Sequence, residues 1–298
     1  MRVAAVDLGT NTTRLLVADV VDGRIDADLH RETRITRLGE GVDVRRRLLP
    51  VPVTRVRNAL SDYRRTAEAL GAERVLAVAT SAVRDADNGE AFLGELEWSY
   101  GFTARLVTGD EEARLTRRGA QPGAGELLLD IGGGSTELIL DDFHVSLPMG
   151  AVRFTERHGE DVDRLTTEAS TLLPDLEPRG AVGVAGTVTT LAALDLGLPA
   201  YDRARVDGHR LSRDAARTQL GRLAALPLEE RRRVPALEPE RAPVIVAGAA
   251  ILVATLERYA LAEIRVSERD ILDGIALAAA ELPAPEEGAA PPGAFTCC

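Results

Sequence analysis

Residues 127–140 read LLLDIGGGSTELIL: an apolar run ends at Asp130, three glycines and Ser135 follow, and a second apolar run begins. A hairpin between two buried strands needs only about two turn residues, usually Asn-Gly or Asp-Gly. Glycine also lets the backbone approach a ligand closely and point its N–H groups at an anion. The stretch therefore predicts two buried strands joined by a turn with more glycine than a hairpin needs, and it raises the question of which ligand such a turn could bind.

The start of the chain repeats this design. Residues 2–25, RVAAVDLGTNTTRLLVADVVDGRI, contain an apolar strand ending at Asp7, a Gly-Thr-Asn turn, a second strand and the hairpin signal Asp22-Gly23. Residues 126–147, ELLLDIGGGSTELILDDFHVSL, match this segment in order and spacing. Such a duplicated unit predicts two similar lobes.

Further segments are typical of an α/β protein. Residues 74–88 suggest a buried strand followed by a polar loop, and residues 181–194 a strand, a Gly-Thr turn and a helix. Residues 242–259 suggest the same strand–turn–helix design, with Gly248 at the junction. Ligands lie beyond the carboxyl ends of the strands in such sheets, so these loops are expected to converge. Helices are expected over 52–70, 110–119, 161–175, 212–225 and 268–280.

The composition excludes several classes of protein. The 298-residue chain has a net charge of −11, which disfavours broad nucleic-acid binding. Its longest apolar run, Val244 to Leu256, is too short to cross a bilayer. The only cysteines, Cys297 and Cys298, are terminal and cannot form a disulfide framework, and the sequence begins with a strand pattern rather than a signal peptide. We expect a cytoplasmic protein without nucleic-acid or membrane partners and with a disordered tail from Leu282.

The chain contains no lysine, so arginine supplies all of its 36 strongly basic side chains. A P-loop, which needs a lysine, is therefore excluded. Any phosphate must be held by backbone N–H groups, arginines and a metal ion. Arginine runs such as Arg231–Arg233 are expected to be solvated faces.

Carboxylates stand where a metal ion bound to phosphate would need them. Asp7 and Asp130 end their strands, and Glu137 lies on the strand after the second turn. Mg²⁺ is usually bound by one or two carboxylates together with phosphate oxygens. A single glycine turn is more often a tight hairpin, but two matched turns together with Gly186-Thr187 and Gly248 favour phosphate binding.

Residues 107–120, VTGDEEARLTRRGA, contain a candidate general base. Thr108 and Glu111 have the spacing of a capping box, in which the Glu111 carboxylate reaches back to the start of the helix. Glu112 is then left to act as a base toward a water molecule. On the residues alone, the alternative interpretation is favoured, in which Glu112 is an ordinary first-turn acid that complements the helix dipole.

Arg84 lies in the segment ATSAVRDADN, just after a buried strand. A guanidinium group in this place suits bidentate contact with a phosphate. The alternative interpretation is a salt bridge with Asp85 or Asp87.

Seven motifs occur in the order typical of one enzyme family: VDLGTNTTRLLVA, ATSAVRDADN, TGDEEARL, LDIGGGSTEL, SLPMGAVRFTE, AGTVTTLAAL and VSERDILDGIAL. Together they resemble the exopolyphosphatase / guanosine pentaphosphate phosphohydrolase (Ppx/GppA) family over residues 3–277. The resemblance implies an α/β fold with two ribonuclease-H-like lobes of the actin/Hsp70/sugar-kinase superfamily and an interdomain cleft. The lobes would comprise residues 1–122 and 123–267, with a helix near 268–281 packing back on the first lobe and a tail at 282–298.

The resemblance also implies roles for single residues. Glu112 would activate the water that attacks the terminal phosphorus of inorganic polyphosphate. Asp130 and Glu137 would serve catalysis and hold Mg²⁺ or another divalent cation such as Mn²⁺, and Asp7 stays an expected metal ligand from its place at the end of its strand. With Gly186 and Thr187, the expected phosphate-binding set is Gly9, Thr10, Asn11, Arg84, Gly133, Gly134 and Ser135.

The sequence departs from the family in places. It ends before the C-terminal helical region of longer members, so we expect short-chain polyphosphate as substrate. Asp207 stands where relatives often carry histidine, and arginine must replace lysine in lining a polyanion channel. The resemblance further suggests a homodimer.

Three other functions use the same residues. The first is hydrolysis of guanosine pentaphosphate, and the second is phosphoryl transfer to ADP or another acceptor. The third is a non-catalytic sensor of polyphosphate or of guanosine penta- or tetraphosphate. A sensor would have no need of a poised base, so the carboxylates Glu112, Asp130 and Glu137 argue against it.

Overall fold

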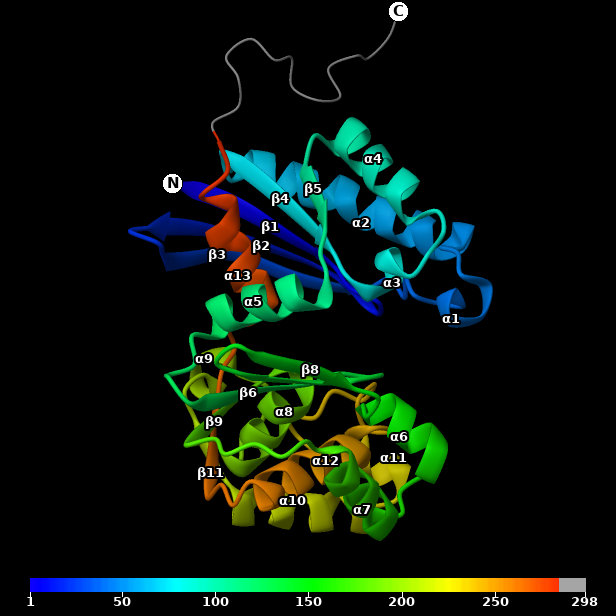
Figure 1. Ribbon diagram of the computed structural model, residues 1–298, viewed down its shortest axis with the longest axis vertical. Helices are drawn as coiled ribbons and strands as arrows, with labels where there is room; N and C mark the ends of the chain where they lie inside the picture. The colour runs from blue at the N-terminus through cyan, green and yellow to red at the C-terminus, as the bar shows by residue number, and fades with distance from the viewer. Residues whose placement is uncertain (284–298) are drawn as a thin grey trace, which may run out of the picture. The chain divides into compact units, whose positions relative to one another are not determined.

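The computed structural model describes residues 1–283, which divide into two compact units (Figure 1). Unit 1 combines Met1–Gly119 with the C-terminal segment from Ile271, and unit 2 comprises Ala120–Asp270. Most of the expected tail, including Cys297 and Cys298, lies outside the described residues.

Unit 1 contains a five-stranded mixed sheet in the order β3-β2-β1-β4-β5. The first three strands are antiparallel neighbours, whereas β1, β4 and β5 run parallel. The two strands and the Asp22-Gly23 hairpin predicted for the first segment are confirmed, and this turn has positive φ at both residues. The strands are β1 (Arg2–Leu8), β2 (Thr12–Val21), β3 (Arg24–Ile35), β4 (Arg74–Ala79) and β5 (Thr103–Leu106).

Alternating side chains of β1 divide the core of unit 1 between the two faces of its sheet. Ala4 and Val6 pack in one cluster with side chains of α2 and α4, whereas Val3 and Ala5 pack in another with α13 (Figure 1). The C-terminal helix is therefore an integral layer of this unit. The helices are α1 (Val42–Arg45), α2 (Pro50–Ala69), α3 (Ser81–Arg84), α4 (Gly89–Tyr100), α5 (Gly109–Ala120) and α13 (Ile271–Ala279).

Unit 2 contains a six-stranded mixed sheet in the order β10-β11-β9-β6-β7-β8. Its strands are β6 (Glu126–Ile131), β7 (Thr136–Leu140), β8 (Phe143–Leu147), β9 (Gly180–Val184), β10 (Arg210–Ser212) and β11 (Glu263–Val266). The helices of unit 2 share one large apolar cluster with Leu127 and Leu129 of β6, in which α8 and α12 lie next to β6. The helices are α6 (Ala151–His158), α7 (Val162–Leu172), α8 (Ala185–Asp195), α9 (Arg203–Val206), α10 (Arg213–Ala225), α11 (Leu228–Arg231) and α12 (Ile245–Arg258).

The two sheets share one topology. The order β8-β7-β6-β9-β11 in unit 2 repeats β3-β2-β1-β4-β5 in unit 1, with antiparallel and parallel neighbours in the same places. This is the strand order of the ribonuclease-H-like fold. The predicted fold class, two such lobes in an α/β protein, is confirmed.

The prediction for residues 242–259 was wrong. No strand precedes a turn there, because the segment forms α12, and Gly248 lies inside the helix rather than at a junction. A short apolar run rich in β-branched residues looks the same in a buried helix as in a buried strand. The glycine serves close packing, since a Cβ at this position would lie 2.7 Å from Cγ2 of Thr187.

Two local expectations also need correction. The polar loop after β4 begins with the short helix α3, and Arg84 is its last residue. The run Arg231–Arg233 is not a wholly solvated face, because the Arg231 side chain is fully buried. Its guanidinium group donates to three backbone carbonyls and to both carboxylate oxygens of Glu160, which compensates the burial of its charge.

Within residues 1–283, no helix combines the length and apolar character needed to span a membrane.

Candidate active site

The two glycine turns have nearly the same backbone geometry. Gly9 N–H donates to the Thr12 carbonyl, and Gly132 N–H donates to the Ser135 carbonyl, each at 3.0 Å. A Cβ at either glycine would lie 3.1 or 3.2 Å from that carbonyl oxygen, which is closer than a side chain tolerates without adjustment. The tight turn therefore favours glycine at these two positions.

The turns also use their carbonyl groups in the same way. The Thr10 and Asn11 carbonyls accept hydrogen bonds from residues 36–39, and the Gly132 and Gly133 carbonyls accept from the first residues of α6. Within residues 1–283, the N–H groups of Thr10, Asn11, Gly133 and Gly134 donate to no carbonyl oxygen. Each turn thus leaves N–H donors available for an anion, as a phosphate-binding turn requires.

Gly150, which precedes α6, fixes the position of the second turn. A Cβ at this residue would lie 2.4 Å from the Gly133 carbonyl oxygen, so only glycine lets α6 begin against the turn. Arg153 Nε then donates to the Gly134 carbonyl at 2.7 Å.

A row of polar side chains crosses the sheet of unit 2 beside this turn. Asp130 on β6 is the register partner of Glu137 on β7, and Glu137 is the partner of Ser146 on β8. Register partners project from the same face of a sheet, so the two carboxylates are neighbours. Glu137 Oε1 also accepts hydrogen bonds from Ser135 Oγ at 2.6 Å and from Ser146 Oγ at 2.9 Å.

The corresponding row in unit 1 has a different charge. Asp7 on β1 is the register partner of Arg14 on β2, and Arg14 Nη2 lies 2.8 Å from Asp7 Oδ2. Asp7 is buried and has its counter-charge within the same lobe. A second acid, Glu137, occupies in unit 2 the position of this arginine.

The acidic pair of unit 2 fits a divalent cation. Two carboxylates directly opposite each other on one face repel, and a bound cation would remove this repulsion. Among the described residues no group of three or more His, Cys, Asp or Glu side chains could hold a metal ion. Mg²⁺ commonly uses only one or two carboxylates and completes its shell with water and phosphate oxygens, so Asp130 and Glu137 suffice.

The capping box at the start of α5 is confirmed. Glu111 Oε2 accepts hydrogen bonds from Thr108 N at 2.8 Å and from Thr108 Oγ1 at 2.9 Å, and Glu111 N donates to Thr108 Oγ1 at 3.2 Å. The backbone and side-chain donors of Thr108 lower the pKa of Glu111. Because Glu111 serves the cap, the neighbouring Glu112 carboxylate is not needed to start the helix.

Arg84 and Glu112 come together in unit 1. Arg84 Nη1 lies 3.6 Å from Glu112 Oε2, and it donates a hydrogen bond to the Val107 carbonyl at 2.9 Å. The ion pair with Asp85, foreseen as an alternative, is long at 4.0 Å. At the other end of α3, the Ser81 hydroxyl lies 2.9 Å from Thr10 Oγ1, which links this helix to the first glycine turn.

Gly186 and Thr187 lie in the first turn of α8, after Ala185 with its positive φ. Thr187 Oγ1 donates to the Ile131 carbonyl at 3.4 Å, which brings this helix start to the end of β6. The guanidinium group of Arg241 covers Gly186 so closely that a Cβ there would lie 1.9 Å from its Nη1.

Three residues near the predicted site were missed from the sequence: Arg14, Ser146 and Arg241. Aligning the two duplicated segments would have shown that Arg14 holds in the first segment the position that Glu137 holds in the second. Arg241 gave no signal, because it reaches Gly186 from a distant part of the sequence. Asp207, at a position where histidine was expected in relatives, accepts a hydrogen bond from Glu268 N at 2.9 Å.

Comparisons with known proteins give a consistent result. A family model described as the Ppx/GppA phosphatase family matches residues 16–281. The chain is 40% identical to exopolyphosphatase 2 of Mycobacterium tuberculosis, over 94% of this chain and 98% of that protein. It is 28% identical to exopolyphosphatase 1 of Mycobacterium bovis, over 93% and 88% of the two chains. The crystal structure of the Ppx/GppA family member from Aquifex aeolicus superposes with a TM-score of 0.82 at 31% identity, over 93% of this chain and 97% of that one.

Proposed function

Because this chain belongs to the Ppx/GppA phosphatase family, and is thus a hydrolase, we propose that it is an exopolyphosphatase. The reaction would be hydrolytic release of the terminal phosphate of inorganic polyphosphate, with short chains as the preferred substrate. The observation that carries this proposal is the 40% identity, along nearly the whole chain, to a protein named exopolyphosphatase 2.

The chemistry requires a base, and Glu112 is our candidate. Its carboxylate would accept a proton from the attacking water as the water oxygen bonds to the terminal phosphorus. The phosphoanhydride bond then breaks, giving orthophosphate and a polyphosphate chain one unit shorter. Arg84, within ion-pair distance of Glu112, would hold the Glu112 carboxylate in place and contact a phosphate oxygen.

Phosphoryl transfer depends mainly on positioning and on neutralising charge. The N–H donors of the turns at 9–11 and 133–135 support binding of phosphate groups, as does the helix start at Gly186-Thr187. We propose that Asp130 and Glu137 hold Mg²⁺, or Mn²⁺, which when bound would neutralise charge on the phosphate oxygens. Asp7 remains a predicted ligand, but its ion pair with Arg14 makes it the weaker one.

The decisive measurement is phosphate release from triphosphate, short-chain and long-chain polyphosphate, guanosine pentaphosphate and ATP, each with Mg²⁺ and with EDTA. We expect metal-dependent release from polyphosphate that is fastest with short chains. Release from guanosine pentaphosphate alone would replace the exopolyphosphatase assignment with hydrolysis of guanosine pentaphosphate. Tight binding of any of these anions without turnover would overturn the catalytic assignment and leave a sensor. Gel filtration of the chain tests for a homodimer by its apparent size, and the same assay on the eluted fractions shows which species is active.

A further inference from the structure

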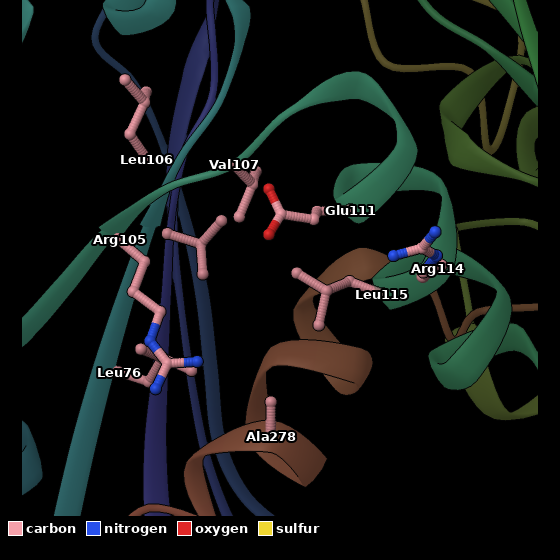
Figure 2. Close-up of a pocket in the computed structure, with 9 residues that line it drawn as sticks. Leu76, Arg105, Leu106, Val107, Glu111, Arg114, Leu115 and Ala278 are labelled. Atoms are coloured by element: carbon pink, nitrogen blue, oxygen red, sulfur yellow. The ribbon is translucent and has the colours of Figure 1, made fainter.

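A cavity of about 380 Å³ lies within unit 1, and Val107, whose carbonyl accepts a hydrogen bond from Arg84, lines it (Figure 2). Its lining comes from four elements, β4, β5, α5 and α13, with apolar side chains forming much of the wall. A cavity of this size is within the range that holds a small organic molecule. The apolar lining residues are Leu76, Val78, Leu106, Val107, Leu115 and Ala278.

Three charged side chains complete the cavity. Figure 2 shows Arg105 and Arg114 on opposite sides of it and the Glu111 carboxylate between them. Most arginines of the molecule have a carboxylate within 4 Å, but in the part of the chain that the structure describes neither Arg105 nor Arg114 has one. The Glu111 carboxylate is held by hydrogen bonds from Thr108. Its one negative charge balances only one of the two guanidinium groups, so the cavity carries one excess positive charge.

We propose that this cavity binds a small organic anion with one negative charge and an aromatic or branched apolar body, and that its binding controls the first turn of α5. The apolar walls would take the body, and Arg105 and Arg114 would take the charged group. Glu111 would repel multiply charged anions, so inorganic phosphate and polyphosphate are poor candidates.

The contacts of the cavity wall give a physical route to the candidate base. Val107 lines the cavity with its side chain, while its carbonyl accepts the hydrogen bond from Arg84. Arg84 in turn lies within ion-pair distance of Glu112, and Glu112 follows Glu111 in the capping turn. A molecule seated against Val107 and Glu111 would therefore restrict the segment that positions Glu112. The effect on turnover rests on the proposed function, whereas binding and the change in α5 do not.

The test uses 8-anilinonaphthalene-1-sulfonate, a fluorescent aromatic anion with one charge, on the full chain. Fluorescence titration is expected to show one site per chain, with affinity falling about tenfold or more in the double variant Arg105→Gln/Arg114→Gln. Ala278→Trp, which fills the cavity, should abolish the site, and Ala278→Leu should weaken it. Arg164→Gln, an exposed arginine of unit 2, is the matched control and should bind as the parent chain does. Circular dichroism melts establish that each variant is folded.

Amide hydrogen exchange and phosphate release complete the test. The probe should slow exchange of residues 108–113 and change the rate of phosphate release in the parent chain, but not in the double arginine variant. Equal binding by all variants, or no binding, overturns the site. Binding at the site without any change in exchange of α5 overturns the control of its first turn. If the chain releases phosphate from no substrate, the proposed function fails, and titration and exchange still decide this inference.

Discussion

At the scale of single residues, the two lobes differ in charge at one cross-strand position. Arg14 neutralises Asp7 in unit 1, whereas Glu137 doubles the negative charge beside Asp130 in unit 2. Duplication alone would give two equivalent phosphate turns. The exchange of arginine for glutamate is our reason for proposing the divalent cation site in the second lobe rather than in the first.

Ser146 gives a test of this asymmetry that leaves the carboxylates in place. Ser146→Ala removes one of the two hydroxyl donors that orient Glu137, so we expect the affinity for Mg²⁺ or Mn²⁺ to fall about tenfold. Turnover at saturating metal should be largely kept. Titration with Mn²⁺ followed by electron paramagnetic resonance measures the change, and Ser170→Ala on α7 is the control. Unchanged metal affinity would argue against a cation at Glu137.

Glu112→Gln tests the candidate base. Without a carboxylate to accept the proton from water, kcat should fall roughly 10²- to 10⁴-fold, while binding of polyphosphate is kept. Steady-state phosphate release and calorimetric titration with polyphosphate separate these effects. Asp163→Asn, in the first turn of α7, is the matched control for loss of a first-turn acid. Equal activity of Glu112→Gln and the parent chain would refute the role of Glu112.

At the scale of elements, the start of α5 carries both a helix cap and the candidate base. Thr108→Ala removes the cap and should lower the free energy of unfolding by about 1 kcal/mol. Ser212, whose Oγ accepts from Ala215 N at 3.0 Å, caps α10 in the same way. Ser212→Ala should lower stability to a similar extent, but only Thr108→Ala should also reduce kcat, because Glu112 lies in the capped turn. Urea denaturation and phosphate release measure both quantities, and equal activity of the two variants would contradict this effect of the cap on kcat.

The buried Arg231 ties α11 to its surroundings through Glu160. Glu160→Gln should lower stability by about 2–3 kcal/mol, toward the lower end for a broken buried ion pair because Glu160 is partly exposed. Its hydrogen bond with Arg231 lowers the pKa of Glu160 below the ordinary 4.5. The stabilisation is therefore present above pH 4.5 and is lost as pH falls through the lowered pKa in the folded state. Thermal melts between pH 3 and 7 should show a weaker acid dependence in Glu160→Gln, with the exposed-pair variant Glu229→Gln as control.

Sequence reasoning succeeded where one residue type determines the backbone. The glycine turns, the strands around them and the Thr108–Glu111 cap follow from local chemistry that any tertiary context must respect. It failed at 242–259, because a helix buried on all sides has no polar face to reveal its period. The partners of the candidate site could not be predicted either, because strand register and long-range contact decide that Ser146 orients Glu137 and that Arg241 covers Gly186.

At the scale of the whole molecule, unit 1 depends on its C-terminal helix. Asp273 on α13 is buried and pairs with Arg31 on β3 at 2.8 Å, and Arg74 Nη1 donates to the Ala280 carbonyl at 2.7 Å. A chain that ends at Asp270 would expose the apolar face of the sheet around Val3 and Ala5. We expect limited proteolysis with mass spectrometry to show rapid cleavage within residues 1–119 of this truncated chain. Unit 2 is the internal control and should stay protected; equal protection of both units would contradict the dependence.

This arrangement also bears on how the protein is made. On the ribosome, unit 2 emerges as one uninterrupted segment, whereas residues 1–119 of unit 1 emerge before it and α13 emerges only after it. The nascent chain must therefore carry an unfinished sheet with one uncovered apolar face while the later lobe folds, although earlier segments usually fold first. Unit 1 is thus begun before unit 2 and completed after it, so chains released before α13 would be open to chaperones and proteases rather than partly active.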